Sequence, residues 1–148
     1  MQVIAAVRRS GVAVPPGETV KNAARIMEAS GVGALVVLDG GRPMGIVTDR
    51  DLVRRVLARG LAFESRVDAV MSMPVVTIEA DADIREAFAL FRTHGNRRLA
   101  VVRDGRFVAM LSVDDLLINV TADLADLIRP VTAEVIFGHH DARAPATR

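Results

Sequence analysis

The strongest constraint on this chain is an internal repeat. When the sequence is shifted by 64 residues against itself, residues 3–53 align with residues 67–117 without a gap. Turn glycines meet turn glycines, as Gly31 meets Gly95, and apolar positions meet apolar positions along the whole alignment. Such self-similarity indicates that one structural unit occurs twice. Any fold for this chain must therefore be a duplicated one.

Both copies predict the same order of elements: strand, helix, strand, strand, helix. The first helix begins at an N-cap residue, Thr19 or Asp83, and apolar residues then recur at helical spacing. Asp-Gly sequences between the next two apolar runs are typical of hairpins, and the last helix opens at Thr48 or Ser112. The predicted strands are 12–14, 34–38 and 44–47, and in the second copy 75–78, 99–102 and 107–111. The predicted core includes Leu35, Val37, Ile46, Leu99, Val101 and Met110.

The sequence therefore predicts an α/β (α+β) fold of tandem β-α-β-β-α units with pseudo-two-fold symmetry. We expect the first repeat and its linker over residues 1–64, the second repeat over 65–120, and an extension and tail over 121–148. A helical apolar stripe continues past the second repeat to Ile128, where Pro130 is expected to end the helix. Residues 131–137 alternate well enough to predict one more short strand, and the polar remainder is expected to fray.

A short motif closes each copy. Residues 45–51 read Gly-Ile-Val-Thr-Asp-Arg-Asp, and residues 109–115 read Ala-Met-Leu-Ser-Val-Asp-Asp, which keeps the hydroxyl and the carboxylate but not the glycine. This motif, in a duplicated unit, resembles the CBS domain, named for cystathionine β-synthase, whose tandem pairs are called Bateman modules. The resemblance covers about residues 2–120. The tail around residues 137–141 (Phe-Gly-His-His-Asp) also resembles tails of stand-alone actinobacterial CBS-pair proteins.

The resemblance implies a regulatory module and not an enzyme. CBS pairs bind an adenosine-containing ligand (AMP, ADP, ATP or S-adenosylmethionine) in clefts between the repeats and modulate a partner protein, which the sequence does not identify. We expect no catalytic residue, no required cofactor and no metal. The first implied site consists of Ile46, Thr48, Arg50, Asp51, Val75, Val76, Thr77, Arg97 and Arg98. The second consists of Val12, Ala13, Val14, Ser112 and Asp115.

The chemistry of these residues suits such a ligand. A helix that begins at Thr48 offers free backbone N–H groups and a positive dipole end to a phosphate. Asp51, one turn further on, accepts hydrogen bonds from both hydroxyls of a ribose. Arg97 and Arg98 match positions that supply phosphate-binding side chains in the family, whereas glycine and alanine stand in these places opposite the second site. If only one site binds, we therefore expect it to be the first.

Simpler explanations of the same residues stay open. Thr48 and Asp51 also suit a plain helix N-cap and first-turn acid, each worth about 1 kcal/mol or less. Arg97 and Arg98 suit a solvated strand edge equally well. The alternative function is a structural dimerisation module whose pockets are vestigial and bind nothing. Both functions agree with a homodimer, because each repeat has an apolar helix face for a symmetric partner. These faces are Leu52, Val53 and Val56, and Leu116, Leu117 and Val120.

Composition argues against several other classes. The chain has no Cys, Trp or Tyr, so disulfides, thiolate chemistry and Trp or Tyr stacking platforms are ruled out. The 19 basic and 18 acidic residues leave a net charge of +1, which argues against nucleic acid as a partner. No apolar run reaches the roughly 18–20 residues that span a bilayer, so we expect no membrane contact and a cytoplasmic location. Adjacent His139 and His140 have poor geometry for one metal ion, and no catalytic triad pattern occurs.

Overall fold

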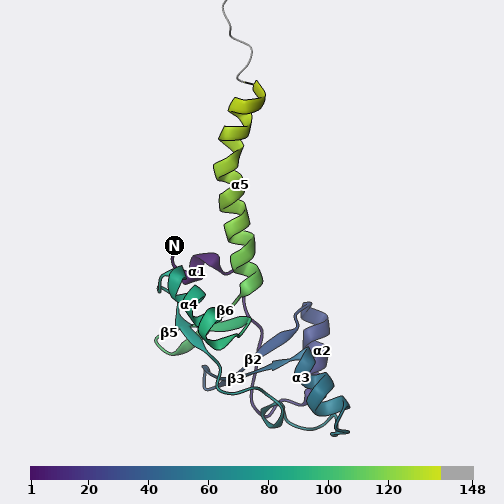
Figure 1. Ribbon diagram of the computed structural model, residues 1–148. Helices are drawn as coiled ribbons and strands as arrows, with labels where there is room; N and C mark the ends of the chain where they lie inside the picture. The colour runs from purple at the N-terminus through teal and green to yellow at the C-terminus, as the bar shows by residue number, and fades with distance from the viewer. Residues whose placement is uncertain (138–148) are drawn as a thin grey trace, which may run out of the picture.

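The computed structural model describes residues 1–137, with side chains described as far as residue 130, and it contains two three-stranded sheets (Figure 1). In each sheet the first two strands are parallel and the last two are antiparallel, as the duplicated unit requires. The first sheet has the order β1 (Ala13–Val14), β2 (Ala34–Asp39), β3 (Arg42–Thr48). The second has the order β4 (Thr77–Glu79), β5 (Arg98–Arg103), β6 (Arg106–Ser112). The predicted tandem α/β (α+β) fold is confirmed.

The hairpins keep the same register in both repeats. Ala34 pairs with Thr48 in the first hairpin, and Arg98 pairs with Ser112 at the equivalent place in the second. Each hairpin closes with a two-residue turn in which both residues have positive φ, Gly40-Gly41 in one and Asp104-Gly105 in the other. Such turns match the twist of the strands, which is why Asp-Gly and Gly-Gly sequences predict hairpins.

The helix after the first strand of each repeat also begins and ends as predicted. Helix α2 spans Val20–Ser30 and helix α4 spans Ile84–His94. The Thr19 hydroxyl accepts a hydrogen bond from the Asn22 N–H at 3.1 Å, which satisfies one free donor at the start of α2. Gly31 and Gly95 end the two helices in the left-handed conformation, as C-terminal glycines commonly do.

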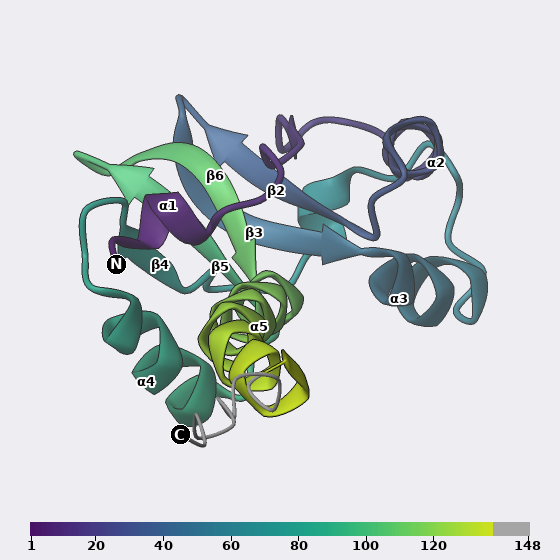
Figure 2. The same cartoon turned by 90° about the horizontal axis from the view of Figure 1, so that it is seen from above.

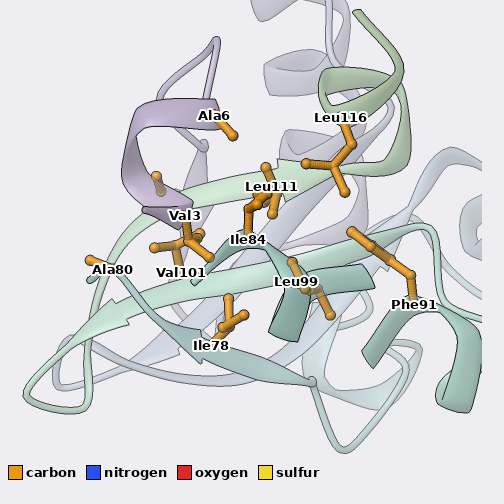
Figure 3. Packing of buried hydrophobic residues seen from close by; sticks show 12 residues of the cluster. Val3, Ala6, Ile78, Ala80, Ile84, Phe91, Leu99, Val101, Leu111 and Leu116 are labelled. Carbon is orange, nitrogen blue, oxygen red and sulfur yellow. The ribbon is translucent and has the colours of Figure 1, made fainter. Parts of the chain in front are cut away.

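Each repeat completes its hydrophobic core with a segment that precedes the other repeat. The N-terminal helix α1 (Val3–Ala6) packs into the core of the second repeat, where Val3 and Ala6 are fully buried (Figure 3). The 3-10 helix η2 (Val67–Ala69) packs into the core of the first repeat. Beside it, the Arg66 guanidinium donates a 2.8 Å hydrogen bond to the Asp68 carboxylate, which lowers the pKa of Asp68. This reciprocal exchange ties the repeats into one unit, as an approximate two-fold relation requires.

The last helices of the repeats differ from each other. In the first repeat a single turn, α3 (Asp49–Asp51), passes into a π-helix, η1 (Leu52–Leu57). In the second repeat, α5 spans Val113–Phe137 and projects away from the two sheets (Figure 1). Seen from above, α4 and α5 lie beside the second sheet, whereas α2 and α3 lie at the other end of the molecule (Figure 2).

The C-terminal prediction was wrong: Pro130 does not end the helix, and residues 131–137 form helix and not a short strand. An internal proline removes one backbone hydrogen bond and costs about 3 kcal/mol, but it does not forbid helix on both sides. A strand over 131–137 would need a sheet edge to pair with, and α5 carries these residues away from both sheets (Figure 1). Residues 138–148, which we expected to fray and which include His139 and His140, lie outside the described residues.

Two core predictions were also wrong. Leu35, Val37, Leu99 and Val101 are fully buried as expected, but Ile46 and Met110 are only half-buried. Side chains alternate along a strand, and the buried neighbours of these two are Val47 and Leu111. Ile46 and Met110 therefore face the boundary between the repeats. Within residues 1–137, no helix combines the length and the apolarity that crossing a membrane requires.

Candidate functional site

Two clefts lie between the repeats, and both are built in the same way. In each cleft, one repeat contributes the end of its third strand. The other repeat contributes the segment before its first strand and the loop before its second strand. The first cleft is lined by Ile46, Thr48, Ser72, Pro74, Val75, Val76, Asn96, Arg97 and Arg98. The second is lined by Arg8, Arg9, Ser10, Gly11, Val12, Gly31, Val32, Gly33, Ala34, Arg98, Met110, Ser112, Asp114, Asp115 and Ile118.

The first cleft gathers most of the residues predicted for the first site. Six of them line it: Ile46, Thr48, Val75, Val76, Arg97 and Arg98. Thr77, Arg50 and Asp51 do not line it. Thr77 lies in β4, and Arg50 is exposed on the single turn α3. Sequence reasoning missed Ser72, Pro74 and Asn96, whose places follow from how the linker and the loop before β5 cross the boundary.

Thr48 and Asp51 hold each other in a reciprocal capping box. The Thr48 backbone N–H donates to the Asp51 carboxylate at 2.9 Å, and the Asp51 N–H donates to the Thr48 hydroxyl at 3.1 Å. The Asp51 side chain is only 13% exposed, and its other oxygen lies 3.5 Å from the Ser72 hydroxyl. The simple N-cap explanation of this pair therefore describes its geometry.

The expectation of free N–H groups at the start of this helix was wrong. The Asp49 N–H donates to the Gly33 carbonyl at 3.0 Å, and the Arg50 N–H donates to the Asp49 carboxylate at 2.8 Å. With the Asp51 N–H held by Thr48, all three donors of α3 have partners within the chain. A phosphate in the first cleft would therefore have to be held mainly by side chains, of which Arg97 and Arg98 carry the charge.

The second motif repeats this arrangement. The Ser112 N–H donates to Asp115 at 3.0 Å, and the Asp115 N–H donates to the Ser112 hydroxyl at 3.1 Å. The Val113 N–H donates to the Arg97 carbonyl at 3.0 Å, as that of Asp49 does to Gly33. Unlike Asp51, Asp115 lines its cleft. Its carboxylate therefore has accepting capacity on the cleft side.

The second cleft contains three of the five residues predicted for it, namely Val12, Ser112 and Asp115. Ala13 and Val14 do not line it, and Val14 is buried in the first core. Sequence reasoning missed Arg8 and Arg9, because it compared only the loops before the second strands. Both arginines align with the 72–73 segment that borders the first cleft, so the repeat itself contained the information.

The clefts differ in size and in charge. The first has a volume of about 180 Å³ and the second about 620 Å³. Pockets that bury most of a drug-sized ligand have volumes of about 300–1,000 Å³, so only the second falls in that range. Arginines alone supply the charge of the first lining, whereas Asp114 and Asp115 offset arginines in the second. Among the side chains described, no group of three or more His, Cys, Asp or Glu residues could hold a metal ion.

Comparison with known proteins identifies the family. The CBS domain family model matches residues 4–58 and 67–122. The chain therefore belongs to the CBS domain family and carries two CBS domains. MK0525 of Methanopyrus kandleri is 34% identical over 113 residues, which cover 74% of this chain and 58% of that protein. The CBS domain-containing protein YhcV of Bacillus subtilis is 33% identical over 106 residues, covering 72% of this chain and 76% of YhcV.

Solved structures share the fold. A CBS domain protein from Pyrobaculum aerophilum, in a structure complexed with AMP, matches with a TM-score of 0.71 and 24% sequence identity. The match covers 78% of this chain and 90% of that one. The duplicated three-stranded sheets thus belong to a fold found in a known CBS domain protein.

Proposed function

We propose that this chain is a regulatory module, not an enzyme, that binds an adenosine-containing ligand in the clefts between its CBS domains and thereby modulates a partner protein. The observation that carries the proposal is the second cleft. It combines a nucleotide-sized volume with Arg8, Arg9 and Arg98 for phosphate and Asp115 for ribose hydroxyls. The complex of the Pyrobaculum aerophilum protein with AMP supports the ligand class.

The first cleft has a different part in this proposal. Its smaller volume and its arginines suit the phosphate end of a ligand, with Val75, Val76 and Ile46 as apolar walls. Thr48 borders this cleft. The Asp51 carboxylate keeps accepting capacity beyond its one short hydrogen bond in the capping box, but its side chain is largely buried and does not line the cleft, so it would have to become more accessible before it could accept a ribose hydroxyl. Arg50 and Thr77 are exposed and do not line this cleft, so their side chains would have to turn towards it to take part. The preference for the first cleft that the arginines suggested stays a prediction.

The alternative function, a structural dimerisation module with empty pockets, rests on a separate observation. Both repeats expose apolar side chains on their last helices, among them Leu57 in the first and Leu117 in the second. A homodimer that covers them is also part of the regulatory proposal, as is a cytoplasmic location. Ligand binding, and not the dimer, therefore distinguishes the two functions.

A nucleotide titration tests the proposal. Calorimetry with AMP, ADP, ATP, S-adenosylmethionine and adenosine is expected to give binding, with phosphate-bearing ligands bound more tightly than adenosine. Arg8→Ala should weaken AMP binding about tenfold or more in the second cleft, since a hydrogen bond to a charged group contributes about 1.5–3 kcal/mol. Arg103→Ala is the matched control, because Arg103 is exposed and lines neither cleft.

Two results would contradict the proposal. If none of these adenosine compounds binds at millimolar concentration, the structural dimer takes its place. If adenosine and AMP bind equally well and Arg8→Ala behaves like the control, the proposed role of the arginines is wrong.

A further inference from the structure

We infer that Arg98 couples the two clefts, so that a phosphate-bearing ligand in one weakens the binding of a second ligand in the other. This inference rests on the proposed function and adds a regulatory property to it. Arg98 opens β5 and pairs in register with Ser112, the hydroxyl residue of the second motif and the last residue of β6. Arg98 is half-buried, and it is part of the lining of both clefts.

Arg98 breaks the symmetry of the repeat. Its counterpart in the first repeat is Ala34, which lines the second cleft only. The boundary between the repeats therefore has one guanidinium at this position. A symmetric pair of arginines would have given each cleft a separate guanidinium. In the part of the chain with described side chains, no carboxylate forms an ion pair with Arg98. The guanidinium is thus available to a phosphate in either cleft.

A neighbouring ion pair should also make a ligand in one cleft weaken binding in the other. Arg97 lines the first cleft, Asp114 lines the second, and their side chains lie 3.4 Å apart. Both side chains are about 70% exposed (73% and 68%), so a ligand can separate them at little cost. A phosphate that attracts Arg97 and Arg98 into the first cleft leaves the Asp114 and Asp115 carboxylates less compensated in the second. The second cleft then repels an anion.

Reciprocity makes the effect measurable from either side, because two linked binding sites change each other's affinity by the same factor. We expect a factor of about five or more, at the lower end of typical couplings between sites. The effect should require a phosphate, since adenosine has no charge to attract either arginine. It should therefore be present with AMP and absent with adenosine.

The two clefts differ in size and charge, so they can bind AMP with different affinities even without coupling. The affinity of each cleft must therefore be measured while the other cleft is closed. Val75→Trp places a bulky side chain in the first cleft, and Ser10→Trp places one in the larger second cleft to obstruct a ligand there without filling it; neither changes the charge. Calorimetry of each variant gives the AMP dissociation constant of one open cleft. The parent gives two AMP dissociation constants, and each closed-cleft variant gives one. We expect the product of the parent's two constants to be about five times the product of the two variant constants, or more. If a Trp variant lacks a cooperative melt, Phe at the same position replaces it.

The variant Arg98→Ala, combined with each closed cleft and alone, should lower this ratio to the part that the Arg97–Asp114 pair supplies, while Arg103→Ala should leave it unchanged. If each closed-cleft variant binds one AMP but the parent binds only one in total, the coupling is stronger than expected and the inference stands. Equal products in the parent and in the variants, a ratio that Arg98→Ala does not lower, or AMP binding by only one of the closed-cleft variants would overturn it. These results leave the proposed function intact, whereas the absence of any adenine-nucleotide binding removes both.

Discussion

At the scale of single residues, the glycine that opens the 45–51 motif lies where two backbones approach each other. The Ile46 N–H donates to the Ser72 carbonyl at 3.1 Å, and the Ser72 N–H donates back to the Ile46 carbonyl at 2.8 Å. A Cβ on Gly45 would lie 2.6 Å from the Met71 sulfur and 3.0 Å from the Ser72 carbonyl oxygen. Gly45 therefore makes room for the linker that borders the first cleft. In the second repeat this place is taken by Ala109.

The variant Gly45→Ala should consequently destabilise the protein, because the linker backbone cannot move aside as freely as a side chain. Overpacking of this kind costs about 1–3 kcal/mol, which for a chain of this size lowers the melting temperature by about 3–10 °C. Thermal unfolding followed by circular dichroism measures the change. Gly17→Ala is the control, since a Cβ there would meet only Arg66 side-chain atoms at ordinary distances. Equal melting temperatures for both variants would contradict this account of the motif glycine.

At the scale of secondary-structure elements, sequence predicted what local chemistry determines. The hairpins were recognised because Gly40 and Gly105 have the backbone freedom that their turns need, and α2 was recognised from its cap and apolar spacing. The π-helix η1 was missed, because its sequence differs little from that of an ordinary helix. Arg8 and Arg9 were missed for another reason: the repeat aligns them with the 72–73 segment, but that they border a cleft becomes evident only once the linker is seen to cross to the other repeat.

Helix α5 shows the limit of a rule based on one residue. Pro130 has no N–H to donate to the carbonyl four residues earlier, yet the helix continues to Phe137. Pro130→Ala restores that donor and should raise the helical ellipticity at 222 nm. It should also slow amide hydrogen exchange in the last turns of α5. Arg129→Ala, a neighbouring exposed position that keeps every backbone bond, is the control. Unchanged exchange after Pro130→Ala would mean that the proline does not limit the stability of this helix.

At the scale of the whole molecule, the last helices leave a large apolar surface uncovered. An apolar groove of about 350 Å³ lies between α2 and η1, lined by Leu52, Val56 and Phe63 among others. The equivalent groove in the second repeat, about 320 Å³, is lined by Phe88 and Leu116 among others. The apolar stripe continues along α5 through Leu117, Val120, Leu124 and Leu127, all at least half exposed. Exposed apolar surface of this extent marks an interaction site.

We expect a symmetric second copy to cover both grooves at once, because each chain presents the same pair of apolar faces. The three- and four-residue spacing along α5 also suits packing between two helices. We therefore expect light scattering to report a dimer of about 32 kDa, twice the 15.9 kDa chain. Leu117→Glu should shift the mass towards 15.9 kDa, because an unpaired carboxylate in an apolar contact is costly to desolvate. Val108→Glu, on β6 and 38% exposed, should stay dimeric. A parent that is monomeric at high micromolar concentration would show that these faces have another partner.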